Sequence, residues 1–293
     1  MAASRGALRV SGLHGHLDLL AGIDEAGNTV LRRQSFAAPV HISKPHRDEG
    51  WLVVNMASPS PGLLADDRVN VNVEVESGAR LLLTAPSANR IHTMAEGFAE
   101  VSQRFMVNAG GSLDVWPEYL IPQKDSAYRQ KTRIEIQQGG TLLWTESIAP
   151  GRTAHGEVFE FRDMRIATDV VFNGHAIVRE RYRIGREHPS IHGLRSIFPQ
   201  GYYASIVCIA PTMESVSAKL AELGKSLDSS HAWIGYSQLA AGACVVKVIA
   251  ADSPMLRTLV AAVRTLLQRA AGIGSPSVRR VTGEPALSGP AAS

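Results

Sequence analysis

The sequence predicts a mainly β protein, built as a large layered or solenoid-like stack of β-strands with a C-terminal α-β-β-α portion that holds two helices. Three observations predict this class. Short segments of alternating apolar and polar residues fill the first two thirds of the 293 residues. Glycine-containing turns recur between these segments at similar spacing. Helical periodicity is confined to the last third of the chain.

The alternating segments are short enough to be single strands and are bounded by turn residues. They are HLDLLAG, TVLRRQ, WLVVNMA, RVNVNVEV, RLLLTAP, EVSQRFMV, SLDVWP, YRQKTRIEI, TLLWTES and HGEVFEFRDMRIATDVVF. In YRQKTRIEI, one face is charged and the other holds Tyr128, Gln130, Thr132, Ile134 and Ile136. Asn173-Gly174 lies between two β-rich arms and predicts a type I′ hairpin, and IDEAGNTVL predicts a looser one.

A weak internal repeat links three of these segments. VEVESGARLLLTAP, FMVNAGGSLDVWPE and IEIQQGGTLLWTE each contain a strand, a glycine turn and a second strand. Their glycines Gly78, Gly110 and Gly139 are 32 and 29 residues apart. Such a period is typical of β-units stacked on one another, although independent hairpins with ordinary glycine turns explain the pattern equally well.

The second strand of two of these units ends at a carboxylate. If the units stack, Glu118 and Glu146 emerge at the same edge of neighbouring layers. Glu118 also lies between the rigid Pro117 and Pro122. Two carboxylates at one edge are compatible with a metal or partner site, and equally with solvated strand ends.

The C-terminal part is predicted to contain two helices that flank two apolar strands. In TMESVSAKLAELGKSL, apolar residues recur at helical spacing, and Gly224 lies near the end. The helix in SPMLRTLVAAVRTLLQRAAG has Ser253 as its predicted N-cap, Pro254 in the first turn and Gly272 after its end. We expect one domain over residues 1–273, with a β body at about 8–204 and the α/β part at 205–273. The Pro-, Gly- and Ser-rich residues 274–293 are predicted to be disordered.

Composition excludes several classes of function. Thirty Lys and Arg residues against 27 Asp and Glu residues, with 6% aromatic residues, do not predict nucleic-acid binding. Cys208 and Cys244 lie in apolar runs and are expected to be buried free thiols. The first residues lack the apolar core of a signal peptide, and no apolar run is long enough for a membrane span. We therefore expect a cytoplasmic protein without membrane contact.

Motifs for nucleophilic catalysis, nucleotide binding or zinc hydrolysis are missing from the sequence. The histidine pairs His14/His16 and His188/His192 have ligand-like spacing. Pro189 disfavours a helix that starts at His188, and His14 and His16 lie beside glycine near the N-terminus, so both pairs are interpreted as surface histidines rather than metal ligands.

The run VRERYRI places Arg179, Arg181 and Arg183 on one face of a strand. Like charges repel unless carboxylates or a partner cover them, and Glu157 and Glu160 are the expected covers. A solvated strand face and a protein-docking surface are both compatible with this pattern.

Four blocks of the sequence together resemble the urease accessory protein UreD family, also called UreH. They are PGLLADDRVNVNVEVESGARLLLTAPSANRIH, WPEYLIPQKDSAYRQKTRIEI, TLLWTESIAPGRTAHGEVFEFRDMRIATDVVFNGHAIVRERYRI and GACVVKVIAADSPMLRTLVAAV. The resemblance runs from about residue 30 to residue 270, and the order and spacing of the blocks match. The family usually has a glycine-rich turn at residues 61–67. Here Asp67 keeps the family's aspartate, while two or three glycines are lost.

The resemblance implies a urease maturation chaperone and not an enzyme. It implies binding to urease apoprotein, UreF and UreG, and transient passage of nickel without a tightly bound cofactor. Oxygen ligands that release a divalent ion readily suit such a route. The candidates carried over for it are Asp66, Asp67, Thr84, Glu118, Glu146 and Glu157.

Two alternatives to this reading stay open. In the first, the protein is a purely structural docking platform without metal relay, for which Arg179, Arg181 and Arg183 would matter most. In the second, it is a β-solenoid glycan hydrolase with Glu118 and Glu146 as acid and base. That enzyme would need a groove lined with aromatic residues, and the Trp and Tyr residues of this chain are scattered.

Overall fold

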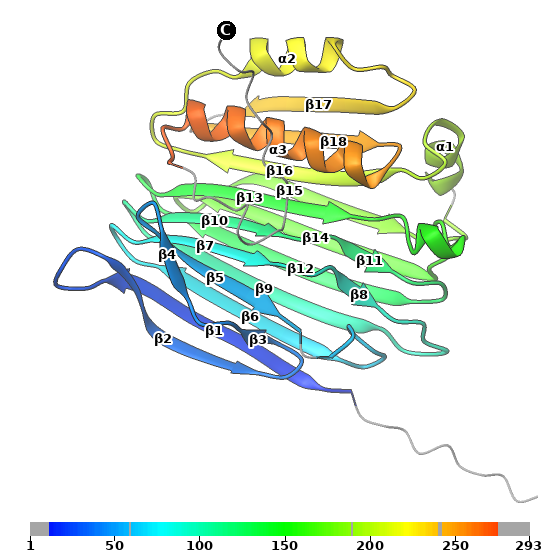
Figure 1. The fold of residues 1–293 in the computed structure, drawn as a ribbon, viewed down its shortest axis with the longest axis horizontal. Coiled ribbons are helices and arrows are strands. Elements are labelled where there is room, and N and C mark those ends of the chain that lie inside the picture. Colours follow the sequence, from blue (N-terminus) through cyan, green and yellow to red (C-terminus); the bar gives the residue numbers. More distant parts are fainter. Residues whose placement is uncertain (1–11, 59, 189, 240–241, 275–293) are drawn as a thin grey trace, which may run out of the picture.

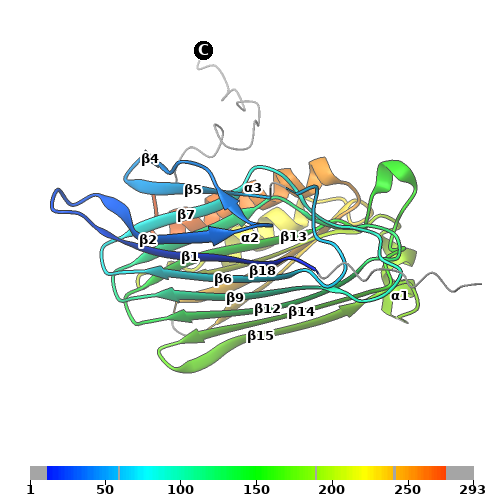
Figure 2. The ribbon, with the colours of Figure 1, turned by 90° about the horizontal axis from the view of Figure 1, so that it is seen from below.

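The computed structural model describes residues 12–58, 60–188, 190–239 and 242–274, and it consists mainly of two sheets packed face to face. The expected mainly β, solenoid-like fold is thereby confirmed. In spatial order the seven-stranded first sheet contains β15 (His175–Ile184), β14 (Asp163–Phe172), β12 (Ala127–Ile136), β9 (Ala99–Val107), β6 (Arg68–Val75), β1 (His14–Ile23) and β2 (Thr29–Ala37). Figure 2 shows this sheet as one layer, with the second sheet behind it.

The second sheet has eleven strands. In order they are β17 (Ala232–Leu239), β18 (Ala243–Ala250), β16 (Tyr202–Ile209), β13 (Thr141–Ile148), β10 (Ser112–Pro117), β7 (Arg80–Ala85), β5 (Trp51–Ala57) and β3 (His41–Ile42), while β4 (His46–Asp48), β8 (Asn89–Ile91) and β11 (Leu120–Pro122) attach at its margins.

The chain alternates between the two sheets in its central part, which makes this part a solenoid. From β6 the chain crosses to β7, returns to β9, crosses to β10, and repeats the path through β12 and β13. Strands of successive coils are parallel, as in the pairs β6–β9, β9–β12, β7–β10 and β10–β13. Figure 1 shows these strands stacked one above another.

The turns of successive coils also stack. The Gly78 N–H donates to the Gly110 carbonyl at 3.2 Å, and the Gly110 N–H donates to the Gly139 carbonyl at 3.1 Å. All three glycines have positive φ, between 76° and 87°, which is a conformation that L-residues with side chains avoid. The three copies in the sequence are therefore layers of one solenoid and not independent hairpins.

Antiparallel strands extend both sheets beyond the solenoid. β1 and β2 form the looser predicted hairpin, and β14 and β15 form the Asn173-Gly174 hairpin, with both turn residues at positive φ as a type I′ turn requires. β16 pairs with β13, and β18 and β17 follow it, so the C-terminal strands continue the second sheet. The expected strand at HGEVFEF is wrong: β14 starts only at Asp163, after a 3₁₀ turn at Thr153–His155.

The structure contains three described α-helices where the sequence predicted two. α2 (Ser217–Lys225) and α3 (Ser253–Ala270) flank β17 and β18 as expected, while α1 (Ser190–Ile197) was not predicted. The predicted N-cap of α3 is wrong by one residue. Asp252, in an extended conformation, accepts the Met255 N–H at 2.8 Å, so Ser253 is the first helical residue. No described helix is both long and apolar enough to cross a membrane.

Helix α3 covers the outer face of the second sheet. Its buried residues Leu256, Leu259, Val260, Val263 and Leu267 pack in a cluster with β16 and β18. Cys208 and Cys244, directly opposite each other on β16 and β18, are buried free thiols in the same cluster, as expected. The other main cluster fills the space between the two sheets.

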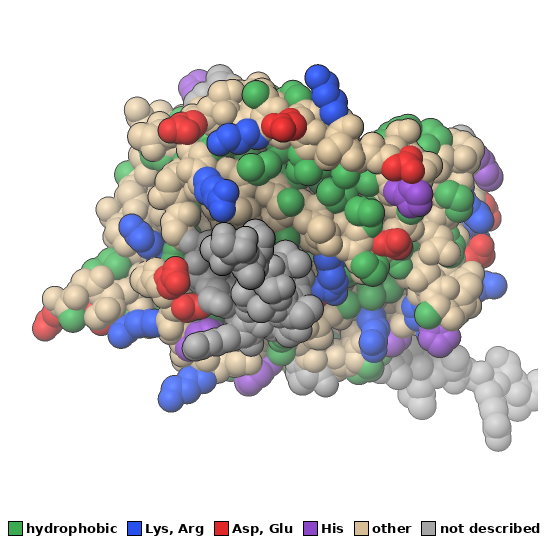
Figure 3. All heavy atoms as spheres, turned by 45° about the horizontal axis from the view of Figure 1, so that its top comes forward, with side chains coloured by type: hydrophobic (Ala, Val, Ile, Leu, Met, Phe, Trp, Pro, Cys, Tyr) green, Lys and Arg blue, Asp and Glu red, His purple; other side chains and the backbone are tan. Residues whose placement is uncertain are grey.

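Beyond Gly274 the chain leaves the described region, so the expected disorder of residues 274–293 concerns residues that lie outside it, except Gly274. Figure 3 shows the helix-bearing face with charges of both signs interspersed among hydrophobic side chains.

Candidate functional site

The inner face of β12 places polar side chains between the two sheets. As predicted, Tyr128, Gln130 and Thr132 face inward with the isoleucines, because side chains alternate along a strand. Gln130 donates through Nε2 to Glu146 Oε1 on β13 at 2.5 Å, so the two sheets are joined by a hydrogen bond across the interior. Glu146 itself is buried, with 8% exposure.

Strand register extends this polar interior across both sheets. In the first sheet, Gln103, Thr132, Thr168 and Glu180 stand side by side on β9, β12, β14 and β15. In the second sheet, Glu146, Ser205 and Lys247 stand side by side on β13, β16 and β18. We call these residues, together with neighbouring inner-face residues, the interior polar seam. Its members are Gln103, Tyr128, Gln130, Thr132, Glu146, Thr168, Glu180, Tyr182, Tyr203, Ser205 and Lys247.

A cavity of about 140 Å³ lies between the sheets along one half of the seam. That volume accommodates several water molecules, and the polar side chains within a mainly apolar lining supply their hydrogen-bond partners. Among its lining residues are Thr84, Gln130 and Glu146, while the exposed Ser87 and Asn89 line its opening to the surface. The other half of the seam, at Tyr182, Tyr203 and Lys247, borders a more apolar hollow of about 380 Å³.

Burial shifts the pKa values of ionisable groups in the interior polar seam. Desolvation raises the pKa of Glu146, although the hydrogen bond from Gln130 and the charge of Lys247 oppose the increase. Burial also raises the pKa of Tyr203 to about 12, so its hydroxyl stays protonated at neutral pH. The pKa of Lys247 falls to about 8, because burial disfavours the ammonium and the charge of Glu146 offsets only part of this effect.

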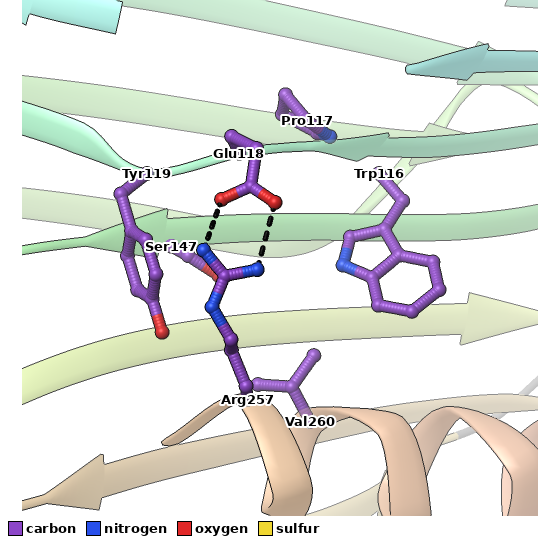
Figure 4. A pocket seen from close by; sticks show the side chains of 7 residues that line it. All are labelled: Trp116, Pro117, Glu118, Tyr119, Ser147, Arg257 and Val260. Carbon is purple, nitrogen blue, oxygen red and sulfur yellow. Dashed lines mark hydrogen bonds and ion pairs between the residues drawn. The ribbon is translucent and has the colours of Figure 1, made fainter. Parts of the chain in front are cut away.

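Glu118 lies at the margin of this cavity, where the second sheet meets α3. Arg257 of α3 donates to both carboxylate oxygens of Glu118, at 2.8 and 2.7 Å, and the guanidinium also lies 5.2 Å from the centre of the Tyr119 ring (Figure 4). The Glu118 side chain is 12% exposed. It borders the cavity between the sheets and also an open surface hollow lined by Arg90, Arg152 and other residues.

Comparison with known proteins identifies the family. The sequence model of the family described as UreD urease accessory protein matches residues 13–282. The chain belongs to the UreD family. It is 36% identical over 259 residues to the urease accessory protein UreD of Opitutus terrae, covering 87% of this chain and 94% of that protein.

Two further relatives are more distant. UreD of Acetivibrio thermocellus is 31% identical over 179 residues, which cover 60% of this chain and 67% of the relative. UreH of Helicobacter hepaticus is 26% identical over 158 residues, which cover 54% of this chain and 63% of the relative.

The residues carried over from the UreD resemblance do not converge on one point. Thr84, Glu118 and Glu146 border the cavity between the sheets, whereas Asp66, Asp67 and Glu157 are absent from its lining. Thr84 donates through Oγ1 to the Trp116 carbonyl at 2.6 Å. Within the described residues no group of three or more His, Cys, Asp or Glu side chains is arranged to hold a metal ion.

Glu118 and Glu146 leave neighbouring layers of the solenoid, but their carboxylates are held on opposite sides of the second sheet. Glu146 bonds to Gln130 of the facing sheet, and Glu118 bonds to Arg257 of the covering helix. Continuing the register of β10 and β13 places Pro117, the last residue of β10, beside Glu146, so Glu118 follows one position later, and alternate residues face opposite ways. A glycosidase needs its acid and its base free to flank one glycosidic bond, and here Arg257 and Gln130 engage the two carboxylates in opposite directions, so this geometry does not support the hydrolase alternative.

Asp67 holds together the loop at residues 61–67, where the resemblance implied a glycine-rich turn. Its carboxylate is buried and accepts the backbone N–H groups of Leu13, at 2.7 Å, and Leu64, at 2.8 Å. The glycine that remains, Gly62, has φ of 148°, and a Cβ there would lie 2.3 Å from the Arg90 carbonyl oxygen. Few other residue types could replace Gly62, whose added Cβ would clash, or Asp67, which accepts two backbone N–H groups. The neighbouring Asp66 adopts a left-handed conformation.

The expected covers of the arginine face are wrong. Arg181 pairs with both carboxylate oxygens of Asp169 at 2.8 Å, and Arg183 pairs with Asp163 at 3.1 Å. Arg179 stands opposite Asp169 in the β14–β15 register. The covering carboxylates therefore come from the neighbouring strand β14.

Neither Glu157 nor Glu160 is paired with these arginines among the described ion pairs. Glu157 is bound by Arg152, which holds the pKa of that carboxyl below its usual value.

The two histidine pairs do not form shared sites in the described structure. His16 bonds to Ser35 on the exposed face of β1, at 2.7 Å. His188 precedes α1, which starts at Ser190, so His188 and His192 do not lie on consecutive turns of one helix.

Sequence reasoning missed Glu180, Lys247 and Arg257. The first two carry a signal that could have found them. Glu180 interrupts the face of β15 that also carries Val178 and Tyr182, and Lys247 is the one charged residue in the apolar run ACVVKVIA. A single charge on an apolar strand face indicates a buried ionic partner. Arg257 carries no comparable signal, because helix surfaces commonly contain arginine.

Proposed function

We propose that this chain is a urease maturation chaperone that relays nickel through the interior polar seam while bound to urease apoprotein, UreF and UreG. Membership of the UreD urease accessory family supports the role in urease maturation. The observation that supports the relay is the cavity between the two sheets, whose lining includes the exposed Ser87 and Asn89 and the buried carboxylate Glu146.

The chemistry of the seam suits transient passage of a divalent ion. Its donors are carboxylate, hydroxyl and amide oxygens, which bind such ions without the affinity of thiolate sites. Glu146 and Glu180 lie on facing sheets, and the neutral Ser205, which neighbours Glu146 in the second sheet, donates to Glu180 at 3.2 Å. An ion would meet few negative charges at once and would be released readily. In this proposal Glu118 is the entry carboxylate and Thr84 adds a neutral oxygen, while Asp66, Asp67 and Glu157 lie outside the cavity lining.

The partner surface in this proposal is the outer face of β15. This strand is at the edge of the first sheet, and it exposes Arg179, Arg181 and Arg183. An edge strand with exposed guanidinium groups suits an acidic partner surface, because arginine makes bidentate bonds to carboxylates. Asp163 and Asp169 would keep Arg181 and Arg183 oriented until the partner binds.

The experiment is co-expression with a urease operon that lacks its own UreD gene. Nickel content and urease activity are measured on the purified urease, and complex formation is measured by co-purification. The wild-type chain, supplied with its own UreF and UreG, should restore both nickel content and activity. A folded chain that restores neither would refute the maturation role.

Glu146→Gln tests the relay within the same assay. The amide oxygen of Gln can accept the same bond from Gln130, so the variant removes the charge and keeps the contact. We expect lower nickel content and activity with unchanged co-purification. The matched control Glu25→Gln removes a charge from an exposed turn and should match the wild type. Full activation by Glu146→Gln would instead favour a docking platform without relay.

A further inference from the structure

The apolar hollow of about 380 Å³ opens at the side of the molecule where the second sheet extends beyond the first. Lys247 of β18 bonds to Glu180 of β15, so the last strand of the first sheet faces β18. β17 continues the second sheet by one strand beyond β18 (Figure 1). Its residues Trp233 and Gly235 line the hollow, and Trp233 is 46% exposed. The inner face of β17 is thus left open at this end of the two sheets.

Aromatic and aliphatic side chains supply almost the whole lining of the hollow. The aromatic members are Phe159, Phe161, Tyr182, Tyr203 and Trp233. Neighbouring rings meet edge to face, with centroids 6.2 Å apart in the Phe159–Phe161 pair and 5.5 Å apart in the Tyr182–Tyr203 pair. Sites for small molecules typically have volumes of roughly 300–1,000 Å³ and a mainly apolar, aromatic lining with few polar groups. The hollow therefore has the size and the composition of a ligand site.

The polar groups at the inner end of the hollow are satisfied by one another. The Lys247 ammonium donates to the Glu180 carboxylate, to the Tyr182 hydroxyl at 2.9 Å and to the Ser205 hydroxyl at 2.8 Å, which uses all three of its hydrogens. Tyr182 donates in turn to the second carboxylate oxygen of Glu180, at 2.7 Å. An anionic ligand would have to displace Glu180 from this ammonium. The lining therefore favours an uncharged molecule.

Gly235 leaves one side of the hollow without a side chain. It lies in the middle of β17, directly beside Lys247 in the register, and its φ lies outside the left-handed region. A Cβ at this position would meet no atom within 4 Å. Neither the backbone nor close packing therefore requires glycine, although glycine weakens a strand. A glycine in a strand interior often marks a place where a ligand approaches the backbone closely.

Phe159 lines the hollow from an unfavourable backbone conformation. Its φ is 58°, in the left-handed region that bulky residues avoid, and the residue is only 4% exposed. The Phe159 N–H donates to the Pro150 carbonyl at 2.7 Å, which holds the turn in place. Strained residues of this kind cluster at binding sites, where the surrounding structure maintains them. The strain is thus a second observation, independent of the glycine, that points to a ligand here.

We propose that this hollow binds a small, uncharged, apolar molecule of the size of two fused aromatic rings. A dry cavity of about 150 Å³ with an apolar lining holds one benzene ring, and this hollow has more than twice that volume. The rings of the ligand would pack against Trp233, Phe159 and Phe161, over the bare backbone of Gly235. This site is independent of the proposed function, because neither nickel nor a partner protein takes part in the binding.

The test uses the isolated full-length chain and N-phenyl-1-naphthylamine, an uncharged dye that fluoresces strongly only in apolar surroundings. The wild type should bind one dye molecule per chain, and dye at ten times its Kd should raise the melting temperature by about 3 °C. Methyl 2-naphthoate should displace the dye at a concentration about tenfold lower than 2-naphthoate does, because only the ester is uncharged. Absence of dye binding, or equal displacement by the ester and the anion, would overturn the proposal.

Gly235→Leu tests whether the dye binds in this hollow. Leucine at this strand position occupies the open space without backbone strain, so the variant should fold and should bind the dye about tenfold more weakly or less. The matched control is Gly193→Leu in α1, where an added Cβ also meets no atom and the side chain lies outside the lining. Unchanged binding by Gly235→Leu, or an equal loss in the control, would contradict the assignment.

A second variant keeps the test decisive if Gly235→Leu does not fold. Gly235→Val adds a smaller, β-branched side chain that suits a strand, and it should weaken dye binding in the same direction. Analytical ultracentrifugation of the wild type accompanies these measurements and should show a monomer. A dimer that Gly235→Leu or Gly235→Val dissociates would mean that a second copy of the chain, and not a small molecule, occupies the hollow.

Discussion

The Arg257 guanidinium of α3 holds both carboxylate oxygens of Glu118, at 2.8 and 2.7 Å, although the two residues are 139 positions apart in the sequence. The C-terminal helix thereby closes over the end of a solenoid layer, next to the mouth of the interior cavity (Figure 4). The carboxylate that the sequence placed between two prolines is thus already paired with a cation. A metal ion that binds Glu118 must compete with this guanidinium.

The first prediction concerns this pair. Glu118→Gln should reduce urease activation by roughly tenfold or more with complex formation intact, because an uncharged amide is a poor ligand. Arg257→Met should not cause this loss, since it leaves the Glu118 carboxylate in place. Activation in the co-expression assay and co-purification are the measurements. Equal losses in both variants would mean that the ion pair itself, and not the carboxylate, is required.

The stability of the fold should depend little on that pair and strongly on a second one. Arg257 is 38% exposed, and such ion pairs contribute at most about 1 kcal/mol. Arg264, on the buried face of the same helix, is 2% exposed and donates through Nη2 to both oxygens of Asp114, at 2.8 and 2.7 Å. It also donates to Thr145 and lies 4.1 Å from the centre of the Trp116 ring.

The second prediction is that Arg264→Met lowers the free energy of unfolding by about 3–5 kcal/mol, because Asp114 is left buried without its counter-charge. The double variant Asp114→Leu/Arg264→Met should recover most of the loss, since both charges are gone. Urea denaturation followed by circular dichroism measures both. A double variant no more stable than the single one would show that packing of the guanidinium, rather than charge pairing, is the main contribution.

The third prediction concerns the stacked turns. Gly139→Ala should cost about 1 kcal/mol, because φ is 87° and alanine avoids that conformation, although no atom lies closer than 3.7 Å to the added Cβ. Gly139→Asn should cost less, since asparagine tolerates left-handed backbone. The control is Gly193→Ala in α1, where a Cβ meets nothing and helix propensity should improve stability. Similar losses for Ala and Asn would contradict a conformational cause.

These turns also show why the solenoid could be predicted from sequence. Positive φ at each turn requires glycine, as at Gly78, Gly110 and Gly139, and apolar–polar alternation indicates which strand face is buried. Both requirements depend only on residues close in sequence, so the sequence alone displays them. The same holds for the Asn173-Gly174 hairpin. The cap of α3 was missed by one residue because Ser253 and the adjacent Asp252 are both good caps, and only the backbone geometry decides between them.

The seam could not be predicted in the same way, because it depends on which inner faces meet. Lys247 and Glu180 are 67 residues apart, and their contact requires β15 and β18 to face each other from different sheets. Of the expected metal residues, Glu146 lies in the seam, whereas Asp67 and Glu157 are held by loop contacts. The family resemblance supplied residue types and positions, but the direction of each side chain is set by register and by the helix that covers the sheet.

The fourth prediction concerns the thiols under α3. Burial raises the pKa of Cys208 to about 12 and that of Cys244 to about 11, from 9.0 in the unfolded chain. Folding therefore keeps both thiols protonated at pH values where the unfolded chain ionises. The stability that this contributes is fully present below pH 9 and is lost as the pH rises through 9 toward 12. At pH 10 the loss is about 1.4 kcal/mol for each thiol.

Urea denaturation at several pH values should therefore show stability falling more steeply between pH 9 and 10 in the wild type than in Cys208→Ala/Cys244→Ala. The comparison removes the contributions of lysine and tyrosine residues, which both proteins share. An aromatic disulfide reagent should fail to react with the folded wild type at pH 8, because both thiols are buried and only the thiolate form reacts. In urea the same reagent should modify two thiols per chain. Parallel pH profiles in the two proteins, or rapid modification of the folded chain, would show that the strands β16 and β18 open under α3 far more readily than their packing indicates.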